Sequence, residues 1–322
     1  MRWKGRRQSG NIRDVRGASP RRSSRGGFPG GFGRSRSGGG RRIRLPTPRG
    51  GGRRAGGGMG IGGLIVIGLI MLFLGINPLS LLGLDTGSGT GGGSFTSPNA
   101  PQSPVTANAE QKEFVAVVLA ETEDVWNGIF QASGATYREP ELVLFSDSVQ
   151  SACGFASSAT GPFYCPGDSR VYLDMSFFGE LENRFGAAGD FAQAYVIAHE
   201  VGHHIQNLTG VLPDFNARRR SMSKTEQNRY SVRVELQADC YAGVWGYFTA
   251  QRGLLERGDL EEALNAATQI GDDTIQRRTR GMVVPESFSH GTAEQRRRWF
   301  DNGFSTGRVE RCDTFSQAYE AL

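Results

Sequence analysis

One stretch of the sequence, AYVIAHEVGHHIQNLTG at positions 194–210, holds three of the four histidines in this chain of 322 residues. Its apolar residues recur at helical spacing from Ala194 to Ile205, which predicts a helix packed against a core. Imidazole and carboxylate groups are costly to bury without partners. The fold must therefore supply partners for His199, Glu200 and His203.

The pattern of these three residues favours a metal site. His199 and His203 are four residues apart, so one helical turn brings both rings to the same face. Two neutral imidazoles there can bind one Zn²⁺ at about 2.0–2.1 Å. Glu200 would lie beside the open coordination position and accept a proton from the attacking water as a general base. This H-E-x-x-H arrangement on a helix is typical of zinc metalloproteases, and the alternative is a structural helix that carries these residues without a metal.

A catalytic zinc site needs a third protein ligand and leaves one position open. Metzincins would have Gly at 206 and His at 209, but the chain has Gln206 and Thr209, which excludes that subclass. In the next long helical segment, VRVELQADCYAG, Glu235 and Asp239 are four residues apart and share a face. We expect Glu235 to be the third ligand and Asp239 to accept the distal N–H of a ligand histidine. A solvated acidic face is the alternative, and the apolar residues on both sides disfavour it.

The two remaining histidines are assigned separately. His204 is turned by about 100° from His203 on the same helix, so we expect it to be structural or at the rim of the site. His290, in SFSHGTAEQRRRWF, is either a donor to the oxyanion of a tetrahedral intermediate or a loop histidine at a helix entry. Tyr172 and Tyr195 are weaker candidates for the same donor role.

Residues 109–322 are numerous enough for one sizeable core and predict an α+β domain dominated by helices, with a small sheet. Helices are expected at about 108–131, 190–208, 225–251, 259–269 and 292–300, and short strands at ELVLF, GPFYC and RVYLDM. The order of these elements suggests that RVYLDMSFF offers a sheet edge on which an extended peptide can lie as an added strand.

The charge is divided unevenly along the chain. Residues 1–60 carry 16 Arg, one Lys and one acid, whereas the remainder carries 20 basic and 31 acidic residues. With 18 glycines and few large apolar side chains in the first 60 residues, residues 1–58 are predicted to be a disordered basic tail. Its Arg/Gly pattern with interspersed Phe looks like an RGG-type nucleic-acid tail. The uncharged run that follows favours anionic lipid headgroups as the partner, and nucleic acid is the less favoured one.

Residues 59–84 contain no charged residue and are long enough to cross a hydrocarbon layer of about 30 Å as a helix. We expect one uncleaved transmembrane anchor. Because the arginines precede it, the positive-inside rule places the N-terminus in the cytoplasm and the C-terminal part outside the cytoplasmic membrane. Residues 85–108, rich in Gly, Ser and Pro, are expected to be a linker to a domain at 109–322.

All four cysteines, Cys153, Cys165, Cys240 and Cys312, follow the predicted anchor. An even number on the side expected to be oxidising favours disulfides, and the lack of a Cys-x-x-Cys pair disfavours a cysteine zinc site. Cys153 with Cys165 closes a natural short loop, which leaves Cys240 for Cys312, although spacing alone does not fix the connectivity.

Four motifs carry a resemblance that covers nearly the whole chain: HEVGHH, ELQADCYAG, CG…GPFYCPGD…VYLDMSFF and SHGTAEQR. After a basic tail and an uncharged run, their combination resembles a bacterial family of neutral zinc metallopeptidases. H-E-x-x-H followed by E-x-x-A-D is also similar to gluzincins such as thermolysin. The resemblance implies that Glu235 is the third ligand, that Asp239 orients a ligand histidine, and that His290 stabilises the transition state. The basic segment NARRRSMSKTEQNRYSVRV between the ligand helices is longer than in thermolysin.

We therefore expect a single-pass protein of the bacterial cytoplasmic membrane with an external zincin-like domain. It would be a zinc metalloendopeptidase that binds one Zn²⁺ per chain and cleaves peptide or protein substrates through a zinc-activated water, with Glu200 as the base. Two other functions stay open at this point. One is a membrane-anchored binding or scaffold protein with a non-catalytic zinc site, and the other is a nucleic-acid tether that acts through the basic tail.

Overall fold

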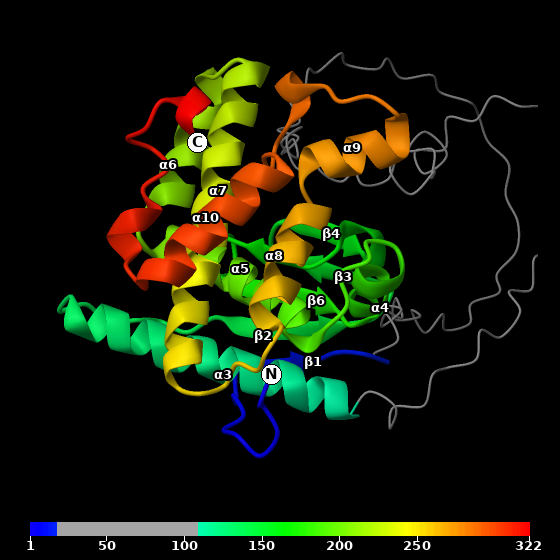
Figure 1. The fold of residues 1–322 in the computed structure, drawn as a ribbon, viewed down its shortest axis with the longest axis vertical. Coiled ribbons are helices and arrows are strands. Elements are labelled where there is room, and N and C mark those ends of the chain that lie inside the picture. The colour runs from blue at the N-terminus through cyan, green and yellow to red at the C-terminus, as the bar shows by residue number, and fades with distance from the viewer. Residues whose placement is uncertain (18–108) are drawn as a thin grey trace, which may run out of the picture.

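The computed structural model describes residues 1–17 and 109–322, in which helices surround a four-stranded sheet and a two-stranded one (Figure 1). The predicted helix-dominated α+β fold is confirmed. The helices are α3 Ala109–Ala132, α4 Ser176–Asn183, α5 Asp190–Leu208, α6 Val211–Arg218, α7 Lys224–Gln251, α8 Asp259–Gln269, α9 Asp272–Arg280 and α10 Ala293–Thr306. The strands are β1 Ile12–Asp14, β2 Glu141–Phe145, β3 Ser148–Ser151, β4 Gly154–Ser157, β5 Phe163–Cys165 and β6 Arg170–Asp174. Short 3₁₀ helices are η2 Ser158–Thr160, η3 Arg219–Ser221, η4 Pro285–Ser287, η5 Val309–Cys312 and η6 Tyr319–Ala321.

The larger sheet has the order β1-β2-β6-β5. β1 and β6 run parallel to β2, whereas β5 runs antiparallel to β6. β6 thus lies inside the sheet with a neighbour on each side. The prediction that RVYLDMSFF presents a sheet edge was wrong, and β5 is the outer strand at that end. β3 and β4, which the sequence patterns did not predict, pair with each other as a hairpin.

Local sequence signals explain where the long helices begin. At the start of α7, the Ser223 hydroxyl accepts from the Glu226 N–H, and the Glu226 carboxylate accepts from the Ser223 N–H. Thr292 and Gln295 form the same reciprocal pair at the start of α10. Such capping boxes satisfy two backbone donors that have no partner inside the helix. The bounds predicted for α5 and α8 agree with those observed.

The basic segment between the ligand helices is itself largely helical, and only its part from residue 225 onward was predicted to be so. It comprises the end of α6, η3 and the first turns of α7. Pro213 is the third residue of α6. The N–H group that proline lacks would have no acceptor within the first turn of a helix, so no helical hydrogen bond is lost. Pro213 is therefore accommodated in the first turn of α6, and the chain changes direction before it, at the left-handed Gly210.

The first 17 residues belong to the folded domain, which corrects the prediction of a disordered tail for this part of the chain. β1 pairs with β2, and the N-terminal segment folds against α3 (Figure 1). Trp3 is 8% exposed, and its ring centroid lies 5.4 Å from that of Phe114. The buried Glu123 carboxylate accepts from Arg7 at 3.0 Å and from Asn11 at 2.9 Å. The prediction of disorder rested on the average composition of residues 1–60, which does not reflect the apolar and ion-paired side chains of the first 17 residues.

This packing also brings residues that precede the predicted anchor into contact with the domain that follows it. Lys112 Nζ lies 3.0 Å from Asp14 Oδ2, so residues 1–17 end next to the point where α3 begins. A single membrane crossing between residues 17 and 109 would separate these contacting partners. The predicted anchor at 59–84, the linker at 85–108 and the rest of the basic tail lie outside the described residues. Within residues 1–17 and 109–322, no helix is long and apolar enough to cross a membrane.

Close helix packing is made possible by glycines at two places. A Cβ atom at Gly202 of α5 would lie 3.0 Å from the Ala238 carbonyl oxygen of α7. Side chains at Gly243 of α7 and Gly303 of α10 would overlap the backbone of the opposite helix. α7 therefore lies against both α5 and α10 at short range, and this arrangement positions the site described below.

Both predicted disulfides are present. Cys153–Cys165 connects the turn between β3 and β4 to β5, and Cys240–Cys312 connects α7 to the end of η5. Each one links elements that flank the histidine-bearing helix.

Replacing Trp3 by Ala should destabilise the folded domain by about 3 kcal/mol, because a large ring leaves its place beside Phe114. Urea denaturation of the full chain measures this loss. The matched control is Arg13→Ala, an exposed position in β1, which should change the stability by less than about 0.5 kcal/mol. Equal midpoints for wild type and Trp3→Ala would show that residues 1–17 contribute nothing to the fold.

Candidate metal centre

α5 and α7 bring three potential ligands together. His199 and His203 extend from α5 and Glu235 from α7, and one ligand atom of each lies within 4.8 Å of the others. Glu235 Oε2 is 3.2 Å from His199 Nε2, and Glu235 Oε1 is 3.7 Å from His203 Nε2. Ligand atoms about 2.0–2.2 Å from one tetrahedral ion are separated by about 3.3–3.5 Å. The observed spacings and the His₂Glu donor set therefore fit Zn²⁺.

Asp239 lies behind His199, where the sequence predicted it. Its Oδ1 is 2.8 Å from His199 Nδ1 and accepts from the Tyr195 hydroxyl at 2.6 Å. Arg296 of α10 donates to both carboxylate oxygens, at 2.8 and 2.9 Å. Burial opposes ionisation, but the Arg296 and His199 charges outweigh it and lower the pKa of Asp239 to about 2. An ionised Asp239 can only accept, so His199 Nδ1 carries the proton and Nε2 is left for a metal.

Glu200, the predicted base, is only 8% exposed and lines the cleft beside the ligand group. Burial raises the pKa of its carboxyl group above the ordinary value. A raised pKa brings a carboxylate closer to the range that suits proton transfer near neutral pH. For Glu235, burial is outweighed by the charges of His203 and His290, which hold its pKa well below the usual range. The two glutamates thus have different electrostatic environments although they share one site.

His290 lines the same cleft from the loop that precedes α10. Its Nδ1 lies 3.1 Å from Asp272 Oδ1, while Asp272 Oδ2 accepts the backbone N–H groups of Ser289 and His290 at 2.7 and 2.6 Å. Burial disfavours a charged imidazole here, but Asp272 outweighs it and raises the pKa of His290. With Nδ1 occupied by Asp272, Nε2 is left as a donor.

The remaining sequence candidates already have hydrogen-bond partners within the protein. Tyr195 is fully buried and donates to Asp239, and Tyr172 donates to Asp168 Oδ2 at 2.8 Å. Both hydroxyls therefore have a structural partner. His204 contacts the Tyr164 hydroxyl through Nδ1 at 3.0 Å and the Arg138 carbonyl through Nε2 at 2.5 Å. With both of its ring nitrogens occupied, His204 has the structural position that its helical angle predicted.

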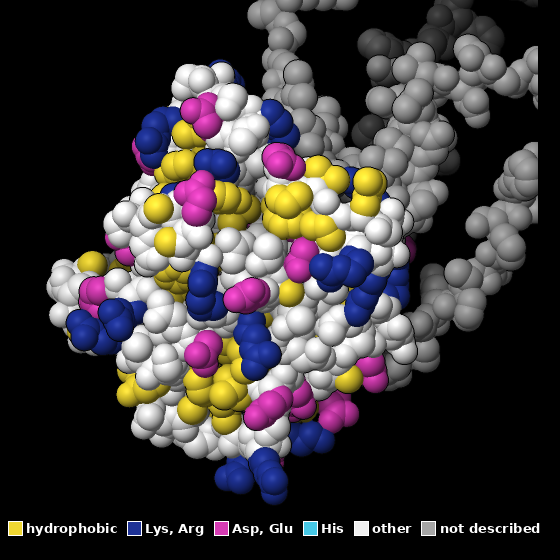
Figure 2. All heavy atoms as spheres, turned by 45° about the horizontal axis from the view of Figure 1, so that its top comes forward, with side chains coloured by type: hydrophobic (Ala, Val, Ile, Leu, Met, Phe, Trp, Pro, Cys, Tyr) yellow, Lys and Arg dark blue, Asp and Glu magenta, His cyan; other side chains and the backbone are white. Residues whose placement is uncertain are grey.

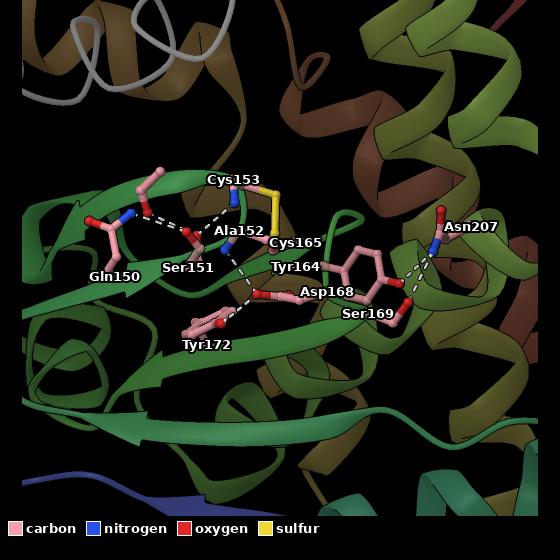
Figure 3. The surroundings of a disulfide bond; sticks show 11 residues. Gln150, Ser151, Ala152, Cys153, Tyr164, Cys165, Asp168, Ser169, Tyr172 and Asn207 are labelled. Carbon is pink, nitrogen blue, oxygen red and sulfur yellow. Dashed lines mark hydrogen bonds between the residues drawn. A yellow bond between two sulfur atoms is a disulfide. The ribbon is translucent and has the colours of Figure 1, made fainter. Parts of the chain in front are cut away.

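A cleft of about 450 Å³ opens over the three ligands. One wall is formed by residues 158–164 and the other by residues of α9 and the loop that follows it. Figure 3 shows how the first wall is braced beside the Cys153–Cys165 disulfide. Asp168 accepts from the Ala152 N–H at 3.0 Å, and the Tyr164 hydroxyl accepts from Asn207 of α5 at 2.9 Å. The wall is thus fixed to the same helix that carries the histidines.

Three residues at the site were not found from the sequence: Arg296, Asp272 and Gln206. Arg296 lies in a run of three arginines, and the helical pattern did not identify which of them points inward. Asp272 precedes His290 by 18 residues, so no local spacing connects them. Gln206 was noted only as a departure from the metzincin motif, yet its Oε1 lies 2.8 Å from His203 Nδ1.

The sequence model of the family described as "Putative neutral zinc metallopeptidase" matches residues 1–315. "Uncharacterized protein YpfJ" of Escherichia coli strain K12 is 44% identical over 318 residues, which cover 99% of this chain and 100% of the relative. "Uncharacterized protein Rv2575" of Mycobacterium tuberculosis strain H37Rv is 41% identical over 261 residues, which cover 77% of this chain and 85% of the relative. No solved structure matches the chain. The match from residue 1 agrees with the packing of the N-terminal segment into the domain.

Replacing Glu235 by Ala should weaken Zn²⁺ binding by more than the ~10–100-fold that loss of an outer partner causes, because one of three protein ligands disappears. Metal analysis after gel filtration and titration against a chromophoric chelator both measure this. Glu180→Ala is the matched control, since Glu180 also lines the cleft but lies outside the ligand group. Full zinc occupancy in Glu235→Ala would mean that another side chain is the third ligand.

Proposed function

This chain belongs to the neutral zinc metallopeptidase family, and we propose that it hydrolyses peptide bonds at the cleft over His199, His203 and Glu235. The observation that supports this most is the position of Glu200. It is a buried carboxylate with a raised pKa, and it lies in the cleft next to a three-ligand set that leaves one coordination position free.

One Zn²⁺ bound by the three ligands would act as a Lewis acid that polarises the scissile carbonyl and lowers the pKa of water. Glu200 accepts the proton of the attacking water and returns it to the departing amine. His290, held by Asp272, donates through Nε2 to the oxygen that becomes negative as the carbonyl carbon turns tetrahedral. The ionised Asp239 keeps His199 in one tautomer throughout the cycle.

An extended peptide is the substrate that this cleft favours. Residues 158–164 lead into β5, the outer strand of the larger sheet, and line the cleft. A substrate that adds to β5 as a further strand would place its backbone across the ligand group. Apolar side chains such as Phe177, Val196 and Ile275 line the cleft and would contact the substrate's side chains. We propose endopeptidase rather than exopeptidase activity, because a substrate bound as an added strand can extend on both sides of the bond that is cleaved.

A binding or scaffold protein with a non-catalytic zinc site is the second candidate. It would need no proton acceptor at the cleft, and Glu200 is therefore the residue that distinguishes the two functions. Most of the basic tail on which the nucleic-acid tether depends lies outside the described residues, so only the surface of the described domain can be compared with that function. Figure 2 shows acidic and basic side chains interspersed over the face that it presents, without the basic stripe expected of a nucleic-acid surface.

We also propose that the domain works in an oxidising compartment, where its two disulfides would persist. The uncharged residues 59–84 would attach the protein to the membrane, with residues 1–17 and 109–322 on the same side. Anionic lipid headgroups stay the proposed partner of the arginines that precede residue 59.

Replacing Glu200 by Gln should leave zinc bound and lower kcat by about 100- to 10,000-fold, because the proton acceptor is lost. Replacing His290 by Ala should lower kcat by about 100- to 1,000-fold, again with zinc retained, because an oxyanion donor is lost. A peptide-library digestion with zinc analysis of the same samples measures both effects. Unchanged turnover in Glu200→Gln would refute its role as the base. Loss of zinc in either variant would refute the assignment of Glu200 and His290 as residues that act on the substrate without binding the metal.

A protease added to the outside of intact cells or spheroplasts should reach an epitope inserted near Arg13 and one near Arg257 equally. Both positions lie in the one domain, so they must share a compartment. Cleavage of one epitope with protection of the other would restore the single-crossing topology and contradict the packing of β1 against β2.

A further inference from the structure

Behind His203 runs a chain of buried amide contacts that leads away from the cleft. His203 Nδ1 is 2.8 Å from Gln206 Oε1. Gln206 Nε2 donates to the Val234 carbonyl at 2.7 Å and to Gln237 Oε1 at 3.1 Å. Gln237 Nε2 donates in turn to the Cys312 carbonyl at 3.1 Å. The chain thus crosses from α5 to α7 and ends at the segment that is disulfide-bonded to α7.

The Cys312 carbonyl, at the far end of this series of contacts, fixes the donor and the acceptor of every hydrogen bond in it. A backbone carbonyl can only accept, so Gln237 must turn its amide nitrogen toward Cys312 and its oxygen toward Gln206. Gln206 then faces two acceptors, the Val234 carbonyl and the Gln237 oxygen, and must turn its nitrogen toward them. Its oxygen is left for His203, whose Nδ1 must therefore carry the proton.

We propose that Gln206 and Gln237 are positioning residues for the metal ligand His203, and that the Cys240–Cys312 disulfide fixes the end of this relay. In one tautomer only, His203 presents the lone pair of Nε2 to a metal. The charged carboxylate of Asp239 sets the tautomer of His199. The tautomer of His203 is set instead by two neutral amide side chains that hydrogen-bond to backbone carbonyls.

Burial makes this chain sensitive to the loss of any member. Gln206 is 0% exposed and Gln237 is 6% exposed, so water does not readily replace a missing partner. An unsatisfied buried amide costs about 1–3 kcal/mol, which disfavours rotation of either side chain. Both glutamines are therefore held in the orientation that the two carbonyls impose.

The Cys240–Cys312 disulfide holds the end of this series of contacts in place through its position on α7. Cys240 follows Gln237 by three residues, on the same face of the helix, and the bond to Cys312 keeps the Cys312 carbonyl within reach of Gln237. Cys312 is fully buried at the end of η5. The Cys153–Cys165 disulfide instead links the turn between β3 and β4 to β5, beside the cleft wall, and includes no member of this series of amide contacts.

The proposal depends on His203 being a zinc ligand, and it does not depend on which bond the protein cleaves. Zinc affinity is measured directly, so a failure of the proposed peptidase activity would leave the test intact.

The test uses the full chain, stripped of metal and titrated with Zn²⁺ against a chromophoric chelator. Gln206→Leu should weaken zinc binding by about 10–100-fold, the range found for partners of ligand histidines. Gln237→Met, further from the metal, should weaken it less but in the same direction.

The two disulfides provide a matched pair of variants. Cys240→Ala/Cys312→Ala should weaken zinc binding more than Cys153→Ala/Cys165→Ala, because only the first disulfide holds the end of the relay. The visible spectrum of the Co²⁺-substituted protein should change in Gln206→Leu, because the geometry around His203 relaxes. A lower melting temperature with an unchanged zinc Kd and Co²⁺ spectrum would reduce Gln206 to a packing residue and overturn the proposal. Equal loss of affinity in both disulfide variants would overturn the role of Cys240–Cys312.

Discussion

The buried carboxylate of Asp239 is the interaction on which the architecture of the site depends. It is fully shielded from solvent, and it accepts from His199 and Tyr195 of α5 and from Arg296 of α10 while belonging to α7. Three helices therefore meet at one charge. An unpaired buried carboxylate would be strongly destabilising, so these helices must keep their relative positions for it to stay ionised. The same positions hold His199, His203 and Glu235 within reach of one metal ion.

The rest of the domain makes that junction possible. Glycines at the contacts of α7 with α5 and α10 let the helix backbones approach closely. Two disulfides link the elements that flank the ligand helices. Residues 1–17 add a strand to the sheet and bury Trp3 against Phe114, so a segment far away in the sequence completes the core beneath the site. The metal centre is thus supported from three sides by parts of the chain that do not touch it.

Local patterns were sufficient to predict the helices α5, α7 and α8 and the group His199, His203 and Glu235, because helical spacing places those residues on defined faces. The partners that come from distant segments, Arg296 and Asp272, could not be predicted, since no periodicity relates them to the histidines. Residues 1–17 were misjudged because the glycine and arginine content of residues 18–58 dominated the average. The apolar residues Trp3 and Ile12 were the signal that a shorter window would have found.

In our proposal, α5 and α7 together hold one divalent cation through two imidazoles and one carboxylate, with a position left for water. X-ray absorption at the zinc edge of the purified full chain tests it most directly. We expect a site with two imidazoles and two oxygen ligands, with bonds of about 2.0–2.2 Å. A third imidazole, a sulfur ligand at about 2.3 Å or a shell made only of oxygen would contradict it.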